Sequence, residues 1–390
     1  MTADPAAQER ELQALVAADR LEEADSRLRV LLGSGSGPLG LWRIWVHVLR
    51  QLGRPQDALP IQRMLVDTMP GDLTARFDLS EILLLLGAFE PGWRAYRFRY
   101  GMPHTMGIER KVQRPRWGGE SLAGRTLLVH DEQGFGDTFQ FMRLLPLVKQ
   151  RSQARVVFDV NPQTLSLAQR SLPEIDAVIA SDALPPPFDV HCELMSLPMA
   201  LNLTLADLPG RIPYLLPDPD RLARWRTRLA SLPRPLVAVA WAGRPTHVND
   251  AKRSMTLDML GRLAMPGVHF VTVQKGPAAA QARTPPAGMA LTPLDEEIAD
   301  FEDTAAILSL VDVLISVDSS PVHLAGALGR PAWVMLPFAP DWRWLMDRAD
   351  TPWYPRHRLF RQTQRHRWEP VIHEVAGALA ALRDSRRHGR

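Results

Sequence analysis

The first 103 residues carry apolar positions at helical spacing, and the pattern repeats along the chain. Ala24 and Ala58 are 34 residues apart, and so are Leu52-Gly53 and Leu86-Gly87. Gly92 stands where the two alanines stand in the earlier copies. A small residue at this position lets two paired helices approach closely. We therefore predict that residues 1–103 form an all-α domain of helical repeats.

A helix–turn–helix unit of about 34 residues is the tetratricopeptide period. This part of the chain resembles a tetratricopeptide array of roughly three repeats, the first of them degenerate. The alternative is a generic helical bundle, but the regular period favours the repeat. Arrays of this kind form concave surfaces for peptides or partner proteins.

Residues 104–122 contain prolines and the pair Gly118-Gly119, which indicate a linker. Beyond it the pattern changes to short apolar runs that alternate with helical stretches such as 139–150 and 163–171. The predicted strands are 126–129, 155–160, 177–180, 236–241, 268–273, 313–317 and 332–336, with proline-rich breaks at 184–187 and 209–219. This alternation predicts α/β structure with doubly wound parallel sheets.

The breaks divide the α/β part into two Rossmann-like domains, residues 123–217 and residues 218–370. Residues 371–390 are expected to hold a return helix, which could pack back onto the first of these domains, and a basic tail. Two open sheets that face each other create a cleft between their carboxyl edges, and such sheets bind ligands there.

Composition narrows the class of protein. Hydrophobic residues make up 46% of the chain and charged residues 23%, and the net charge is only +3. No basic stripe with interleaved aromatic residues indicates a nucleic-acid partner. Continuous apolar stretches such as Ile82–Leu86 are too short to span a membrane. The single cysteine, Cys192, excludes an internal disulfide, and the polar N-terminus is unlike a secretory signal, so we expect a cytoplasmic protein.

The segment HDEQGFGDTFQFMR, residues 130–143, follows an apolar run and opens into a helical pattern. Gly134 and Gly136 allow a sharp turn after the strand and place Asp137 at the mouth of the helix. A dinucleotide fingerprint needs a third glycine where Phe139 stands. The turn therefore suits a neutral substrate with hydroxyl groups, although Asp137 could equally be a helix cap. Asp159 stands where a ribose-binding acid would in a nicotinamide enzyme.

The second α/β domain carries an anion signal in VDVLISVDSSPVHLAGALG, residues 311–329. Ser320 is a good N-cap, and Pro321 suits the first helical position. The helix N-terminus offers N–H groups to an anion. Ser319 and Ser320 add hydroxyl donors, His323 reaches the same anion, and Asp318 would bind a sugar hydroxyl. The alternative is that the serines are caps and His323 is an ordinary helical histidine.

Two further loops follow predicted strands. The first, residues 241–255, presents Lys252 and Arg253, which could neutralise a diphosphate leaving group. The second, residues 272–276, places Gln274 and Lys275 where they could bind a nucleobase or ribose. Solvated loop charges are the alternative for the first loop.

Four motifs together resemble the tetratricopeptide-linked glycosyltransferases related to bacterial heptosyltransferases: DEQGFGDTFQFMR (131–143), VAWAG (239–243), TVQKG (272–276) and SVDSSPVHLAGALG (316–329). The resemblance covers nearly the whole chain and implies a GT-B fold and inverting transfer from a nucleotide-sugar without a bound metal or other cofactor. A more distant likeness to the protein O-GlcNAc transferases implies a protein or peptide acceptor, bound through the helical repeats.

The resemblance also assigns residues. The catalytic base of the family falls on Asp137, its donor motif on Asp318, Ser319, Ser320 and His323, and its pyrophosphate-binding lysine on Lys252. From their positions in the loops we further expect Arg253, Trp241, Gly243, Gln274 and Lys275 in the donor site, and Gln133, Gly134, Gly136 and Arg143 in the acceptor-side loop. The triplet Asp218-Pro219-Asp220 mimics the metal-binding Asp-x-Asp motif of another glycosyltransferase class, and its loop setting favours a chance match.

The leading hypothesis is a single displacement in which Asp137 takes the proton of an acceptor hydroxyl. The alternative is a non-catalytic module that binds a nucleotide-sugar and recruits a protein. A nicotinamide oxidoreductase is a distant third. The aromatic residues of 342–344 and 353–354 are expected either to line the cleft and stack on sugars or to pack in the core.

Overall fold

The computed structural model describes residues 4–102, 105–247 and 249–388. The chain forms two compact units. The first contains Met1–Glu109 together with Phe338–Asp347, and the second contains Arg110–Pro337 and Arg348–Arg390. The segment 338–347 therefore packs with the helical unit, although its neighbours on both sides along the chain lie in the α/β unit. The expected domain boundaries at 103, 122, 217 and 370 stay predictions.

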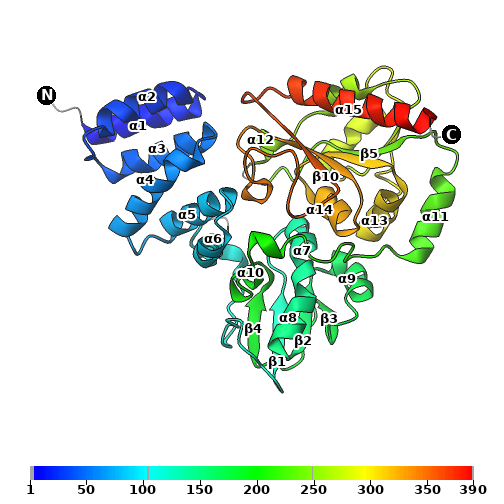
Figure 1. The fold of residues 1–390 in the computed structure, drawn as a ribbon, viewed down its shortest axis with the longest axis horizontal. Coiled ribbons are helices and arrows are strands. Elements are labelled where there is room, and N and C mark those ends of the chain that lie inside the picture. The colour runs from blue at the N-terminus through cyan, green and yellow to red at the C-terminus, as the bar shows by residue number, and fades with distance from the viewer. Residues whose placement is uncertain (1–3, 103–104, 248, 389–390) are drawn as a thin grey trace. The chain divides into compact units, whose positions relative to one another are not determined.

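The helical unit is built from consecutive helix pairs (Figure 1). The pairs are α1 (Pro5–Ala17) with α2 (Leu21–Leu32), α3 (Leu39–Gln51) with α4 (Pro55–Thr68), and α5 (Leu73–Leu85) with α6 (Phe89–Tyr96). Short 3-10 turns follow at Arg97–Gly101 and Met106–Ile108.

The period of 34 is present in the backbone. The turn residue within each pair has a positive φ, 55° at Asp19, 67° at Gly53 and 78° at Gly87. The amide of the next residue then donates to a carbonyl five residues back, in Arg20 to Leu15, Arg54 to Leu49 and Ala88 to Leu83, at 2.8–2.9 Å. This is the hydrogen bond of a Schellman helix end. The first repeat, degenerate in sequence, makes the same turn with aspartate instead of glycine.

The small residues lie where paired helices meet. Ala24 and Ala58 are fully buried. A Cβ atom added at Gly92 would lie 2.7 Å from a methyl carbon of Leu84, on the partner helix of the same pair. The predicted reason for small residues at these positions is therefore confirmed.

Aromatic packing attaches the segment 338–347 to this unit. The Trp342 ring, in a 3-10 turn (Trp342–Trp344), lies 5.2 Å from that of Trp93 and nearly perpendicular to it. Phe338 lies against Gly53, where an added Cβ atom would be 3.1 Å from the phenyl ring. Trp344 is fully buried. For these aromatic residues, core packing is what the structure shows.

The α/β unit contains two parallel sheets. The first has the order β3-β2-β1-β4 and the second the order β10-β9-β8-β5-β6-β7. The strands of the first sheet are β1 (Thr126–His130), β2 (Arg155–Val160), β3 (Ala177–Ala180) and β4 (Val190–Glu193). Those of the second are β5 (Leu236–Ala240), β6 (His269–Thr272), β7 (Leu291–Thr292), β8 (Val313–Val317), β9 (Ala332–Leu336) and β10 (His357–Arg361). The predicted fold class, two parallel α/β domains after a helical domain, is confirmed.

Helices connect the strands. They are α7 (Phe135–Phe141), α8 (Leu145–Ser152), α9 (Leu165–Ser171), α10 (Leu197–Ala200), α11 (Pro219–Leu229), α12 (Asp250–Arg253), α13 (Phe301–Leu310), α14 (Ser320–Ala327) and α15 (Glu369–His388). The helix expected over 139–150 is interrupted by a 3-10 turn at Met142–Leu144, after which Pro146 lies in the first turn of α8. In the part of the chain that the structure describes, no helix is both long and apolar enough to cross a membrane.

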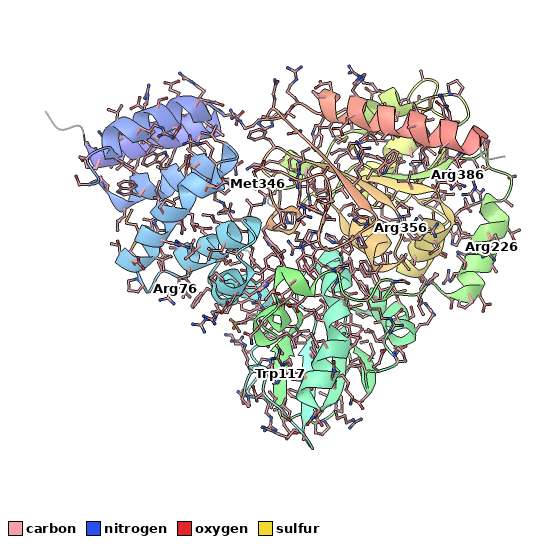
Figure 2. All side chains as sticks on the ribbon, in the orientation of Figure 1. Arg76, Trp117, Arg226, Met346, Arg356 and Arg386 are labelled. Carbon is pink, nitrogen blue, oxygen red and sulfur yellow. The ribbon has the colours of Figure 1, made fainter. Side chains whose placement is uncertain are left out.

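The C-terminal helix α15 packs on the second sheet, not on the first α/β domain as expected. Val371, Ile372, Val375 and Leu379 belong to the same buried cluster as Val237 and Phe360. Near its end, Arg386 donates to Asp312 at 2.6 Å (Figure 2). The apolar stripe of the helix covers the sheet that immediately precedes it along the chain.

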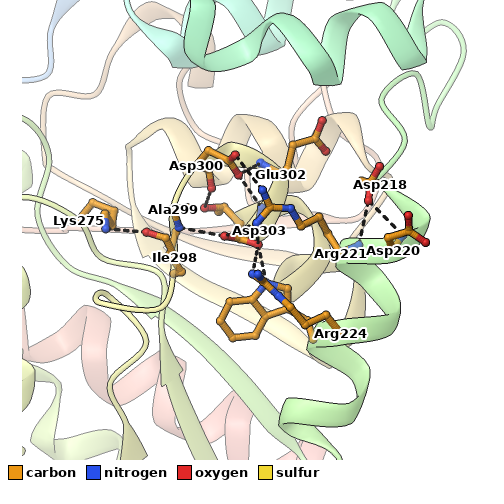
Figure 3. A network of polar contacts seen from close by, with 12 residues as sticks. Asp218, Asp220, Arg221, Arg224, Lys275, Ile298, Ala299, Asp300, Glu302 and Asp303 are labelled. Carbon is orange, nitrogen blue, oxygen red and sulfur yellow. Dashed lines mark hydrogen bonds and ion pairs between the residues drawn. The ribbon is translucent and has the colours of Figure 1, made fainter.

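A buried carboxylate joins α11 to α13 (Figure 3). The Asp303 side chain is fully buried and accepts hydrogen bonds from Arg221, Arg224 and Trp225. Asp218 accepts from the backbone amides of residues 220 and 221, so it is the N-cap of α11. The Asp-x-Asp triplet is thus part of a helix start, which explains it without a metal.

Candidate functional site

The loop after β1 leads into α7 and carries Asp137 in the first turn of that helix. One carboxylate oxygen of Asp137 accepts a hydrogen bond of 3.0 Å from the Gly134 amide, which forms a capping box. The structural role that the sequence allowed is therefore present. A carboxylate has about four lone-pair sites, so a capping bond and chemistry at the same group are compatible.

Asp131, six residues earlier, is a second acid at this loop that the sequence analysis did not single out. Its carboxylate accepts from the Thr138 hydroxyl at 2.8 Å and from the Glu132 amide at 2.9 Å. Burial raises the pKa of Asp131 to about 6, against the lowering effect of the Thr138 bond, and the charge of Asp137 adds to the rise. The position of Asp131 directly after a predicted strand is the sequence signal that could have identified it.

The N-terminal turns of α7 and α14 meet. A Cβ atom added at Gly136 would lie 2.9 Å from Cδ2 of His323. Asp137 is the next residue along, so the predicted base and the predicted donor histidine come from helices in direct contact. Nε2 of His323 lies 3.7 Å from Asp318, and both side chains are largely buried.

Tyr354 fixes the other side of the His323 ring. Its hydroxyl lies 3.0 Å from Nδ1 of His323. If Nδ1 is held by this contact, Nε2 is the nitrogen directed toward Asp318. Tyr354 was considered as a sugar-stacking residue, but it is only 1% exposed and packs behind the histidine.

His357 lies behind Tyr354, with ring centroids 4.7 Å apart. Among the described residues neither of its ring nitrogens has a hydrogen-bond partner. Burial, together with the charges of His323 and Arg143, lowers the pKa of His357 to about 3. This histidine is therefore neutral at physiological pH, and no sequence pattern indicated its position.

The start of α14 differs by one residue from the prediction. Ser319 is the N-cap and Ser320 the first helical residue. The Ser319 hydroxyl lies 3.1 Å from that of Ser316 and does not cap the helix. Pro321 has no N–H, so fewer backbone amides are available at the start of α14. The Ser319 side chain does not accept a capping hydrogen bond from the amides that remain.

The loops that follow β5 and β8 emerge side by side, because Ala240 pairs with Ser316. The loop after β5 contains Gly243, Lys252 and Arg253. A Cβ atom at Gly243 would lie 2.7 Å from the Arg253 guanidinium, so the absent side chain lets the arginine lie on the backbone. Lys252 and Arg253 occupy the short helix α12 and are half-buried.

Three predicted donor residues make contacts within the fold. The Gln274 side chain accepts from the amides of Trp241 and Ala242 at 2.9 Å. The ammonium of Lys275 donates to the carbonyl of Asp295 and to that of Ile298, the second of which Figure 3 shows. The Trp241 indole is fully buried in the sheet core. These contacts shape the loop edge, and direct binding by these side chains stays a prediction.

Arg143 and Asp159 are likewise engaged. Arg143 donates to the carbonyl of Trp353 at 2.8 Å and to the Tyr214 hydroxyl at 3.0 Å, and it stacks on the Tyr354 ring. Asp159 is 1% exposed and accepts two hydrogen bonds from Arg110, at 2.7 and 3.1 Å. A carboxylate held in this way is poorly placed to bind a nicotinamide ribose. Gln133 is half-buried in the loop before α7.

Direct contacts also join the two α/β domains beside this site. Phe301 at the start of α13 packs on Phe135 and Phe139 of α7, at 4.8 and 4.9 Å between ring centroids. Arg170 of α9 forms a two-bond pair with Glu302 of α13, at 2.8 and 2.7 Å. Together these contacts hold α7 close to the second domain.

No protein-family model matches the chain. Protein FlbA of Caulobacter vibrioides is 30% identical over 338 residues, which are 80% of this chain and 56% of FlbA. The chain thus spans little more than half the length of this curated relative.

Among solved structures, the E. coli ADP-heptose LPS heptosyltransferase II aligns with a TM-score of 0.48 and 14% identity, over 67% of this chain and 99% of that chain. A Thermobaculum terrenum O-GlcNAc transferase mutant aligns over 100% of this chain and 94% of that chain, with a TM-score of 0.32 and 13% identity.

Proposed function

We propose that this protein is an inverting glycosyltransferase that moves a sugar from a nucleotide-diphosphate donor to an acceptor hydroxyl. The observation that supports the proposal is the contact between Gly136 and His323, because it brings the Asp137 turn of one α/β domain against the start of α14, the proposed anion site, in the other. A base and an anion-stabilising group on adjoining walls are what a single displacement at a sugar carbon requires.

In the proposed reaction the acceptor oxygen forms a bond to the anomeric carbon as the bond from that carbon to the diphosphate breaks. Asp137 takes the acceptor proton. The departing diphosphate gains negative charge, which the start of α14, His323, Lys252 and Arg253 stabilise. Lys252 and Arg253 supply positive charge of the kind that a metal supplies in other transferases, so the proposed step needs no metal.

Asp137 is preferred to Asp131 as the base because of their surroundings. The Asp131 carboxylate is held by the Thr138 hydroxyl and by the Glu132 amide, at 2.8 and 2.9 Å. Asp137 lies beside the residue that contacts His323. We therefore assign Asp131 a structural role, which is to hold the loop between β1 and α7.

The acceptor is proposed to be a protein or peptide, because the helical repeats provide a surface suited to extended chains. A cytoplasmic location is proposed with it, since nucleotide-sugars are substrates of that compartment.

A second function has one specific observation in its favour. The bond from the Gly134 amide to Asp137 is sufficient reason for an acid at this position. If capping is its only role, the protein is a nucleotide-sugar-binding module that recruits a partner through its repeats.

The Asp137→Asn variant tests the assignment, with Asp207→Asn as its matched control. Asp207 makes the same capping-box contact at Thr204, with the amide bond at 2.7 Å, in an exposed turn outside the site. With a panel of nucleotide-sugars, we expect Asp137→Asn to lose at least about a hundredfold in transfer rate while donor affinity stays unchanged. Turnover that responds to Asp137→Asn no more than to Asp207→Asn would reduce Asp137 to a cap and favour the binding module.

A further inference from the structure

Three ligand-type side chains gather at the end of the first sheet, outside the groups used above. β1 and β4 are parallel neighbours in which His130 pairs with Glu193 and Leu128 pairs with His191. Since alternate residues of a strand share a face, His130, His191 and Glu193 lie on the same face of the sheet. All three are buried, with exposures of 0%, 2% and 1%.

The spacing of their polar atoms suits a single ion. Nε2 of His130 lies 3.1 Å from Nδ1 of His191, in a hydrogen bond that an ion would replace, and the two ring planes are 17° from parallel. Two nitrogens bound to one zinc ion at about 2.0–2.1 Å in tetrahedral geometry are about 3.3 Å apart. One ligand atom from each of the three residues lies within 4.8 Å of the other two.

We propose that His130, His191 and Glu193 bind a divalent transition-metal ion of the zinc type. Two imidazoles and one carboxylate are a ligand set that such ions take, with water completing the shell. In residues 4–102, 105–247 and 249–388 this is the one group of three such side chains that meets the distance criterion for a common ion. The site is independent of the transfer reaction proposed above.

Arg116 is compatible with this ion. Its Nε and one terminal nitrogen both lie 2.7 Å from the same carboxylate oxygen of Glu193. A carboxylate can accept from a guanidinium and ligate a cation together, because it has about four lone-pair sites. The Arg116 side chain is 53% exposed, so water screens its charge and it can move outward.

The ion would have a structural role. His130 is the last residue of β1, and Asp131 and the loop to α7 follow directly. The backbone of β4 is also bridged to the linker, since the Trp117 amide donates to the His191 carbonyl at 2.8 Å. An ion at this point ties β1, β4 and the preceding linker together just before the loop that carries Asp137.

Metal binding by the full chain tests the proposal. After treatment with EDTA and dialysis, the protein is titrated with Co²⁺, followed by visible absorption, and then with Zn²⁺ as competitor. We expect one equivalent of Co²⁺ per chain, displaced by Zn²⁺, and a rise in the unfolding temperature with Zn²⁺ that EDTA reverses. A wild-type protein that shows neither binding nor the temperature shift would overturn the site, leaving a hydrogen-bonded histidine pair.

His191→Gln, with His373→Gln as its control, locates the ion. Glutamine retains hydrogen bonding to His130 but is a poor zinc ligand, and His373 is an exposed histidine on α15. We expect His191→Gln to lose more than about a hundredfold in Zn²⁺ affinity, beyond what outer-shell changes cause, and His373→Gln to bind normally. Binding by His191→Gln equal to that of wild type would also refute the site. Should His191→Gln fail to fold, the wild-type titration and Glu193→Gln decide in the same way.

Discussion

The ring of His323 lies against the backbone of Gly136, so closely that one added carbon at residue 136 would be 2.9 Å from Cδ2. This contact joins the two α/β domains at the predicted site. The variant Gly136→Ala can be compared with Gly134→Ala, because the backbone at Gly134 has room for a methyl group. At Gly134 an added Cβ atom would meet only a carboxylate oxygen of Asp137, at 3.4 Å, which is an ordinary contact.

We expect Gly136→Ala to lower kcat/KM for transfer by about 10- to 100-fold, because a displaced His323 or α7 disturbs the alignment of reacting groups. In Gly134→Ala, kcat/KM for transfer should fall by much less. Gly136→Ala should also unfold at a lower temperature than the wild type, because its added methyl group is overpacked against His323, whereas Gly134→Ala should not. Steady-state kinetics with a common donor measures the difference, and equal losses in the two variants would show that the histidine contact is not what matters.

Tyr354→Phe removes the hydroxyl that lies 3.0 Å from Nδ1 of His323 and leaves the ring in place. A typical buried hydrogen bond contributes about 0.5–1.5 kcal/mol, so donor affinity should weaken by about 3- to 10-fold. Calorimetric titration with a nucleotide diphosphate checks this. A change in thermal stability with unaltered binding would assign Tyr354 to packing alone.

The lowered pKa of the buried His357 predicts how the free energy of unfolding changes with pH. Its folded pKa of about 3 is below the unfolded value of 6.5. The unfolded chain therefore binds the proton first, and the free energy of unfolding falls as pH decreases from about 6.5 toward 3. From pH 7 to pH 5 this histidine alone should cost about 2 kcal/mol.

The variant His357→Phe should lose that part of the pH dependence, which chemical denaturation at pH 7 and pH 5 measures. His373→Phe, at an exposed position of α15, serves as the control and should keep the wild-type slope. Asp78 and Asp131 each have a pKa raised to about 6, mainly by burial, and favour the folded state at low pH. Their effect is common to all three proteins, so it cancels in the comparison. An unchanged slope in His357→Phe would contradict the buried, neutral state.

Gly92 and Gly377 form a pair with opposite expectations. In Gly92→Ala the new methyl would lie 2.7 Å from the Leu84 side chain and 3.3 Å from its backbone nitrogen, and such overpacking costs about 1–3 kcal/mol. At Gly377, in the exposed part of α15, nothing lies within 4 Å of an added Cβ atom. Gly377→Ala should stabilise by up to about 1 kcal/mol through helix propensity. Thermal unfolding measures both, and stabilisation by Gly92→Ala would argue against close helix packing at the repeat position.

Much of the fold follows from local pattern. The strands at 155–160, 177–180, 313–317 and 332–336 have the predicted bounds, because most of their residues are apolar and they form short runs typical of parallel strands. The strand β4 was missed since His191 and Glu193 interrupt its apolar pattern. The helix α11 was missed for a different reason. Asp218 and Pro219 indicate a loop when viewed alone, although they are the N-cap and first residue of a helix.

The site was predictable only in part. The chain segments that carry Asp137 and His323 have recognisable turns, so both were found from their motifs. Tyr354 and His357 are 31 and 34 residues beyond His323, and their proximity arises from strand order, which no local pattern reports. Likewise, the contacts that engage Arg143 and Lys275 go to backbone carbonyls distant in sequence.

The packing of residues 338–347 on the helical repeats affects how deletion experiments should be interpreted. A fragment that begins at residue 110 would retain Trp342 but lack Trp93 and Tyr96, the rings it covers. Low solubility or lost activity in that fragment would then reflect a newly exposed tryptophan as much as a missing acceptor surface. Substitutions on the surface of the intact array are the cleaner way to separate the two effects.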